Sequence, residues 1–221
     1  MIFGKWKNWK VFFFSLFNAF VDGVIFLFIA LFIILKSGLI TAEGATLEVL
    51  ESNINLYFPN AFINLIIGFG VIFGSLLGGY LADLKSRTLS VYSSLLFTTI
   101  ALLLFLVPAQ IVILYIFAFL VGSSSGWRNS GFSAVVGQVS KLYPETDSTY
   151  FATCASFANF GTVIGLNFIG LIFEGLSTFS IFIAFSVIFI FLAAVGNIGI
   201  IPFAFMDKKD YELPKKLKPI K

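Results

Sequence analysis

Two charged side chains, Asp22 and Arg128, lie deep inside long apolar stretches of the chain. Asp22 follows Lys10 by twelve residues and Arg128 precedes Lys141 by thirteen. At 1.5 Å per helical residue, both would lie about 18–20 Å from the same end of the molecule. Equal depth permits an ion pair, and two interpretations are open. In the first, Asp22 titrates in a substrate or proton site where Arg128 or Asn129 holds an anionic group; in the second, the pair of Asp22 and Arg128 only stabilises a helix bundle.

Several asparagines accompany these charges within apolar stretches. A buried amide can bond a substrate across helices, or it can serve only to hold two helices together. Polar groups of this kind are costly against lipid, so we expect the segments that carry them to surround a polar interior. The candidate substrate or proton site therefore comprises Asp22 and Arg128 with Asn18, Asn64, Asn129 and Asn159, and Asn167 is a further amide of the same type.

The elements that position these residues are apolar helices. Of the 221 residues, 59% are apolar and 11% are charged, against about 25% charged in a soluble domain. A bilayer core needs roughly 20 apolar residues per helix, and continuously apolar runs exclude outer-membrane strands. We therefore predict an all-α integral membrane protein with a six-helix domain in residues 1–206 and a basic tail in residues 207–221. The expected helices cover residues 11–35, 62–82, 89–107, 111–139, 150–173 and 181–205.

The basic residues predict an orientation. If the helices alternate, twelve of the fourteen Lys and Arg side chains fall on the side of the two termini. Since Lys and Arg in short loops set orientation, we expect a multi-pass protein of the cell membrane with both termini cytoplasmic. The tail is then a solvated topology anchor or a contact for anionic lipid. The basic residues form no aromatic-interleaved patch, so no nucleic-acid partner is expected.

The connection between the first two expected helices has two interpretations. Leu47, Leu50, Ile54 and Tyr57 recur at helical spacing, which predicts either a short amphipathic helix or an extension of the flanking helices. Pro59 would then fit the first turn of the second helix, where a missing N–H is tolerated.

Glycines spaced four apart form two small-residue faces. Such spacing is typical of close helix contact. The alternative is that these faces meet another six-helix unit. The faces consist of Gly70, Gly74 and Gly78 in the second helix and Gly161 and Gly165 in the fifth.

The loop after the second helix carries a resemblance to a known family. The stretch GYLADLKSRTL, residues 79–89, resembles the signature G-x-L-A-D-R-x-G-R-[KR] of the major facilitator superfamily, which lies between helices 2 and 3 of a six-helix half. The matching residues are Gly79, Leu81, Ala82, Asp83 and Arg87. Leu84, Ser86 and Thr88 depart from the signature, while Lys85 supplies a base one position away.

The resemblance continues more weakly in Phe119–Gly126, which is similar to the family's Gly-rich fourth helix, and in Tyr143–Gly165, which is similar to its fourth-to-fifth connection. It implies that helices 1, 2, 4 and 5 line a cavity or the contact between halves, with 3 and 6 peripheral. It also implies a cytoplasmic gate in which the aspartate joins a charge and helix-end network. The residues concerned are Gly79, Asp83, Lys85 and Arg87.

A complete member of that family has twelve helices, so the chain resembles one half. Three explanations are open: a fragment, a half paired with a separately encoded one, or a homodimer about an axis along the membrane normal. The implied function is secondary transport of a small solute by alternating access. The alternative is a non-transporting membrane scaffold or assembly subunit that binds a partner through its glycine faces.

Enzymatic function is not expected. The sequence contains no histidine, which removes the usual serine and cysteine triads and any His metal site. An aspartyl mechanism needs two acids, and Asp22 is the only acidic residue deep within an expected helix. No phosphate loop occurs, and we expect no metal and no cofactor.

Overall fold

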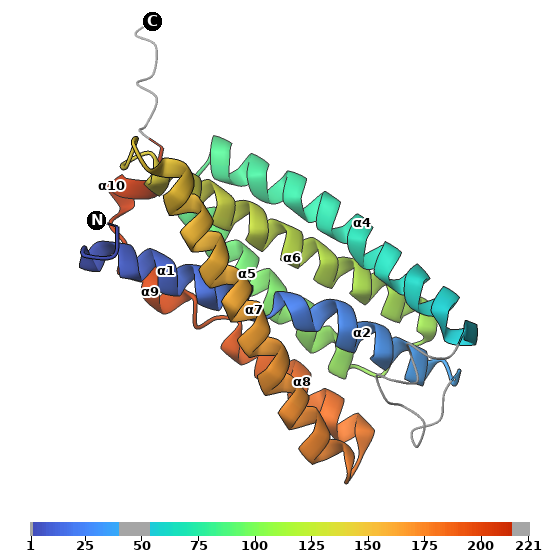
Figure 1. Cartoon of the computed structure of the whole chain (residues 1–221). Helices are drawn as coiled ribbons and strands as arrows, with labels where there is room; N and C mark the ends of the chain where they lie inside the picture. Colours follow the sequence, from blue (N-terminus) through green and yellow to red (C-terminus); the bar gives the residue numbers. More distant parts are fainter. Residues whose placement is uncertain (1, 40–53, 214–221) are drawn as a thin grey trace, which may run out of the picture.

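The computed structural model describes residues 2–39 and 54–213, and within these ranges all regular structure is helical (Figure 1). Six segments are long and apolar enough to cross a membrane: Trp6–Lys36, Leu56–Leu84, Arg87–Leu106, Ile111–Ser140, Asp147–Ser177 and Ile181–Ala204. The prediction of an all-α chain with six such helices is therefore confirmed. The elements are α1 (Trp6–Ala19), α2 (Asp22–Lys36), α4 (Ile54–Leu84), α5 (Arg87–Leu103), the 3-10 turn η2 (Leu104–Leu106), α6 (Ile111–Ser140), α7 (Asp147–Ser177), α8 (Ile181–Val195), α9 (Ile200–Ala204) and α10 (Lys208–Tyr211).

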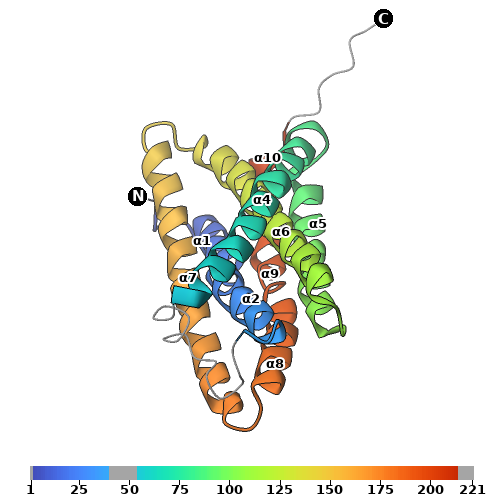
Figure 2. The same ribbon diagram turned by 90° about the vertical axis from the view of Figure 1, so that its right-hand side faces the viewer.

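The helices form one bundle with both ends of the chain at the same end of the molecule (Figure 1). α4 packs along α6, α1 packs along α7, and α5 contacts both α6 and α8. Seen from the side, α7 lies along one edge and α5 along the other, with α1 and α2 between them (Figure 2). α1 and α2 therefore run through the middle of the bundle, and most of the α2 side chains are buried.

The second spanning helix begins earlier than predicted. α4 starts at Ile54, which places Pro59 inside the helix, so the prediction of Pro59 in the first turn is wrong. Proline lacks the N–H that would bond a carbonyl one turn back. Residues 54–61 thus extend the helix, whereas Leu47 and Leu50 lie outside the described residues.

The first spanning helix is interrupted at Phe20 and Val21, between α1 and α2. Two carbonyls just before the interruption accept hydrogen bonds from side chains of other helices. Arg128 of α6 donates to the Asn18 carbonyl, and Thr162 of α7 donates to the Ala19 carbonyl at 3.1 Å. A side chain inserted into the helical hydrogen-bond ladder is a known cause of kinks, so tertiary contacts produce this one.

The sixth spanning helix is interrupted between α8 and α9, from Gly196 to Gly199. The amides of Asn197 and Ile198 bond carbonyls three residues back, at 3.2 and 2.9 Å. Pro202 cannot donate to the Ile198 carbonyl, because it has no N–H. Two glycines and one proline within seven residues therefore explain the break locally.

The two interruptions lie against each other. A side-chain carbon added at Gly199 would lie 3.6 Å from the backbone nitrogen of Asn18, and one added at Gly196 would lie 3.0 Å from the side chain of Val21. Both spanning helices therefore change direction at one place in the bundle, in contact with α6.

The glycine faces pack within the chain. A carbon added at Gly74 would overlap the backbone of Ser123 in α6, and one added at Gly161 would overlap the carbonyl of Leu16 in α1. The remaining members behave alike: Gly70 lies against Phe119, Gly78 against Trp127 and Gly165 against Phe20. Both faces therefore allow close approach of helices inside this unit.

The beginning of the expected tail packs on the bundle. Residues Lys208–Tyr211 form α10, and Tyr211 is buried with its ring 5.0 Å from that of Phe203. The prediction of a solvated tail is therefore wrong for residues 210–212, where Tyr211 is buried and its two neighbours are half-buried, whereas Asp207, Lys208 and Lys209 are exposed. Residues 214–221 lie outside the described part of the chain.

Candidate functional site

Arg128 lies at the junction of the two helix interruptions. Its side chain is 1% exposed, and Nη2 donates to the Asn18 carbonyl. Within the described part of the chain, Nε and Nη1 have no hydrogen-bond partner. A carbon added at Gly196 would lie 3.6 Å from Nη1 and 2.7 Å from the Leu192 carbonyl, so the glycine packs closely against the guanidinium. A buried cation with free donors is costly in the fold and well suited to bind an anion.

Asp22 is the first residue of α2 and is partly buried. Its Oδ1 accepts a hydrogen bond of 3.1 Å from Ser125 Oγ in α6. The ion pair that equal depth would permit between Asp22 and Arg128 is not formed. In the ranges that the structure describes, the ion pairs are Lys7–Asp210 and Lys209–Asp207.

Asn129 is exposed on α6, next to the buried arginine. It lines a cavity of about 430 Å³ between α4 and α6. The cavity reaches Asp83 near the end of α4, so it runs from the middle of the bundle to the loop. Its lining is polar and small: Ser75, Gly79, Asp83, Asn129, Ser130, Ser133 and Ala134.

The predicted asparagines do not converge. Asn18 is buried beside Arg128 and contributes its backbone carbonyl. Asn64 donates to Asn60 within α4, at 3.1 Å to the carbonyl and 3.0 Å to Oδ1. Asn159 and Asn167 are exposed on α7, and Asn167 donates to the carbonyl one turn back. The structure therefore brings Asp22, Asn18 and Arg128 together and leaves Asn64 and Asn159 elsewhere.

The loop between α4 and α5 binds Tyr211 and Glu212, the last residue of α10 and the residue after it. Glu212 accepts hydrogen bonds from the Ser86 hydroxyl at 2.7 Å and from the Arg87 and Thr88 amides at 3.1 and 2.8 Å. Arg87 is buried, and its Nη1 donates to the Tyr211 carbonyl at 2.6 Å. Glu212 thus satisfies free amides at the start of α5, where helix geometry also favours a negative charge.

These contacts change the acidity of Glu212. Burial by itself would raise the pKa of this carboxyl, but hydrogen bonds from Thr88, Ser86 and Arg87 together lower the pKa below its ordinary value of 4.5. The neighbouring Tyr211 has its pKa raised, chiefly by burial. At neutral pH Glu212 is therefore a carboxylate that holds the end of the chain on the loop.

The four residues of the expected gate fall into different settings. Arg87 is buried, whereas Asp83 and Lys85 are exposed. Asp83 faces the polar cavity described above. A carbon added at Gly79 would meet nothing within 4 Å, so that side of α4 is open.

Several polar contacts escaped sequence reasoning. Ser125 lies three residues before Arg128, and that helical spacing was the available signal. Glu212 lies in a charged segment that gave no sign of docking. Asn197 donates to Thr99 of α5 at 2.7 Å, which ties the third and sixth spanning helices together. In the described ranges no group of His, Cys, Asp or Glu side chains is arranged to hold a metal ion.

Comparison with known proteins identifies no relative: no family model matches the chain, and neither the curated proteins nor the solved structures contain a match.

Proposed function

We propose that the chain is a six-helix half of a secondary transporter in the cell membrane, with both termini cytoplasmic, and that it moves a small solute by alternating access. One observation carries the proposal: Arg128 is buried at the junction of two interrupted spanning helices with two donor nitrogens free in the described structure. In transporters, discontinuous helices near the middle of the membrane build the substrate and ion sites.

Each central residue has a role in this proposal. Arg128 binds an anionic group of the solute through Nε and Nη1, which the fold leaves unpaired. Asp22, held by Ser125, carries the proton that couples to movement. A carboxyl group in a span is a standard proton carrier in pumps and transporters.

The polar cavity supplies a route. Ser75 and Asn129 line it toward the centre of the bundle, and Asp83 and Ser133 line it nearer the loop. A solute that leaves Arg128 toward the cytoplasm would pass these side chains. The resemblance of the loop to the facilitator signature places Asp83 at the gate, and the contacts of Arg87 and Glu212 connect that gate to the end of the chain.

The proposal requires a second six-helix unit. α7 exposes Ser156, Asn159, Asn167 and Glu174 on one face, and such groups are costly against lipid. α4 exposes large apolar side chains along its length. The apolar face of α4 fits a contact with a second unit, and the polar face of α7 fits a water-filled interior shared by the two units. A homodimer would supply both halves.

The scaffold alternative relied on glycine faces that bind a partner protein. All five of these glycines contact residues of this same chain, and this observation favours transport over the scaffold alternative. We therefore retain transport as the single proposal.

The test is solute movement in vesicles. The purified chain is reconstituted with a pH-sensitive dye inside, and small carboxylic and phosphoric acids are added one at a time. Uptake of at least one acid should change the internal pH, and Asp22→Asn should abolish this change. Glu145→Gln, which removes an exposed acid in the turn before α7, is the matched control. Absence of movement with every acid, or full movement in Asp22→Asn, would refute the proposed mechanism.

A further inference from the structure

An apolar groove lies between α1 and α9 on the outer surface of the bundle. Its volume is about 460 Å³. Apolar side chains make up all of its lining except one ammonium group, that of Lys10. The lining residues are Trp6, Lys10, Phe13, Phe17, Ile201, Pro202 and Phe205.

A second, polar cavity of about 260 Å³ lies on the other side of Lys10, between α1 and α10. It is lined by Lys7, Asn8, Lys10, Val11, Val139, Met206, Asp207, Lys209 and Asp210. Lys10 lines both spaces. A ligand with a charged head in the polar cavity and an apolar chain in the groove would therefore contact Lys10 at the point where head and chain join.

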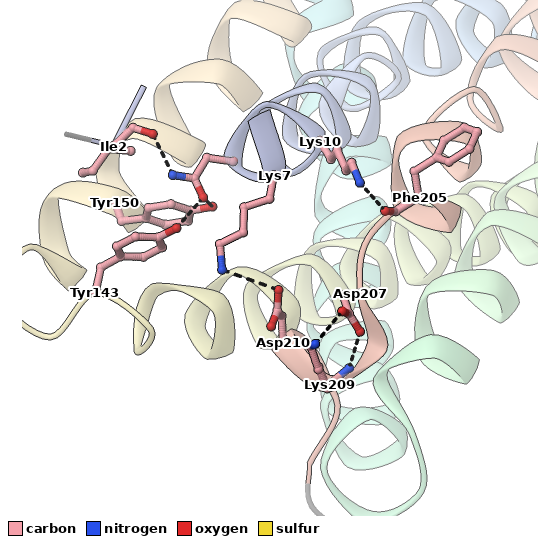
Figure 3. A network of polar contacts seen from close by, with 10 residues as sticks. Ile2, Lys7, Lys10, Tyr143, Tyr150, Phe205, Asp207, Lys209 and Asp210 are labelled. Carbon is pink, nitrogen blue, oxygen red and sulfur yellow. Dashed lines mark hydrogen bonds and ion pairs between the residues drawn. The ribbon is translucent and has the colours of Figure 1, made fainter. Parts of the chain in front are cut away.

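The charges around the polar cavity leave Lys10 available (Figure 3). Lys7 pairs with Asp210 at 3.8 Å, and Lys209 pairs with Asp207 at 3.1 Å. Lys10 Nζ donates to the Phe205 carbonyl at 2.9 Å and forms no ion pair with a carboxylate of the described residues. An ammonium has three donors, so Lys10 retains donors for an anion.

The position of the two spaces matches a membrane surface. The elements that line them, α1, α9 and α10, lie at one end of the bundle (Figure 1), and most basic residues of the described part of the chain belong to this end. Trp6 is 72% exposed beside the groove, and tryptophan favours the level of the lipid headgroups.

We propose that this surface binds an anionic phospholipid, with the lipid phosphate on Lys10 and one acyl chain along the groove between α1 and α9. Basic pockets next to spanning helices recognise such headgroups. Phosphatidylcholine would fill the groove equally well and also carries a phosphate, but its quaternary ammonium cancels the net negative charge, so it would gain less from Lys10 than an anionic lipid. The proposal does not depend on transport.

Trp6 provides the readout, since it lines the groove. Trp9→Phe and Trp127→Phe leave Trp6 as the single tryptophan of the full chain. This protein is reconstituted in vesicles of ordinary phosphatidylcholine to which one brominated lipid is added. The added lipid is either phosphatidylglycerol or phosphatidylcholine with brominated acyl chains, and the two are compared at equal mole fractions. Bromine quenches tryptophan fluorescence on contact, so quenching reports acyl chains in the groove.

Brominated phosphatidylglycerol should reach half-maximal quenching at a roughly fivefold lower mole fraction than brominated phosphatidylcholine, because one lysine near the surface contributes about a factor of five to ten in affinity. Lys10→Gln should remove this preference, and Lys10→Arg should keep it. Lys141→Gln, which deletes an exposed charge at the end of α6, should leave it unchanged.

Two results would overturn the proposal. Equal quenching by the two lipids would mean that the groove is open to bulk lipid only. A preference that survives in Lys10→Gln would place the headgroup elsewhere. If Lys10→Gln misfolds, as judged by its circular dichroism, Lys10→Met replaces it as a neutral variant that keeps a long aliphatic side chain. The proposal then requires that Lys10→Met lose the preference for phosphatidylglycerol.

Discussion

Arg128 and Arg87 show at the residue scale how one side-chain type serves two purposes. Both are buried. Arg87 connects α5 to the docked end of the chain through the Tyr211 carbonyl, whereas Arg128 keeps Nε and Nη1 free in the described structure. Unpaired buried charges lower stability unless a ligand compensates, and the proposed binding of an anionic solute would offset this cost at Arg128.

Arg128→Gln should therefore abolish solute movement while the melting temperature in detergent stays equal or rises. Arg87→Gln, the matched variant, should lower the melting temperature by about 3–6 °C, since it loses a charge-assisted hydrogen bond. Thermal unfolding and vesicle uptake of both variants check this. A large thermal loss in Arg128→Gln with uptake intact would assign that residue to the fold alone.

Glu212 predicts a pH dependence. Its pKa is lowered in the folded chain, so its stabilisation is present above the ordinary value of 4.5 and is lost as the pH falls through the lower folded value. The Arg87 and Thr88 amides that it accepts from should be protected from hydrogen exchange at neutral pH.

Glu212→Gln should speed exchange of these two amides at neutral pH, because a neutral amide is a weaker acceptor at a helix start. Asp210→Asn, two residues away in a partly exposed ion pair, should leave them protected. Equal protection in Glu212→Gln would show that Tyr211 alone docks this segment.

Glycine packing decides stability at the scale of elements. Gly74 lies against the Ser123 backbone, whereas Gly68 and Gly79 on the same helix have open space around an added carbon. The same Gly→Ala change therefore has opposite consequences at positions one or two turns apart.

Gly74→Ala should destabilise the bundle by roughly 1–3 kcal/mol, since α4 must move away from α6. Gly68→Ala should be neutral or stabilising by up to about 1 kcal/mol, because alanine is the better helix former. Melting temperatures of the two variants, measured in one detergent, provide the comparison. A stable Gly74→Ala would contradict the close α4–α6 contact.

At the scale of the whole molecule, the spanning helices are buried unequally. In their most apolar windows, 78% of residues are buried for Trp6–Lys36 but 17% for Asp147–Ser177 and 28% for Leu56–Leu84. The least buried of these, α7, also carries exposed asparagines. A second unit on α4 and α7 would cover both.

A cross-linking experiment separates this arrangement from a monomer. In a Cys154→Ala background, Leu76→Cys on α4 with Val163→Cys on α7 should yield a product of two chains, 2 × 24.3 = 48.6 kDa. Leu96→Cys with Ile183→Cys, equally exposed on α5 and α8, should remain monomeric. Monomers from both pairs would exclude the homodimer.

Sequence reasoning succeeded where the physics is local. Runs of about 20 apolar residues predict spanning helices, and the six appear where their hydropathy places them. The sequence prediction of one continuous helix over residues 181–205 missed the break between α8 and α9, although the residues that explain it, Gly196, Gly199 and Pro202, are local. Pro59 and the docked Tyr211 were missed, because neighbouring helices and a distant aromatic contact outweigh their local tendencies.

The sequence by itself thus determined the helical class, the number of helices long and apolar enough to span a membrane, and the positions of Asp22 and Arg128 within them, since these depend only on length and polarity along the chain. Tertiary structure decided that Asp22 bonds Ser125 while Arg128 bonds the Asn18 carbonyl. It also decided that α1 and α2 separate at Phe20 and that Glu212 reaches α5. Each of these depends on side chains meeting from helices far apart in sequence, and spacing within one helix carries no information about such a meeting.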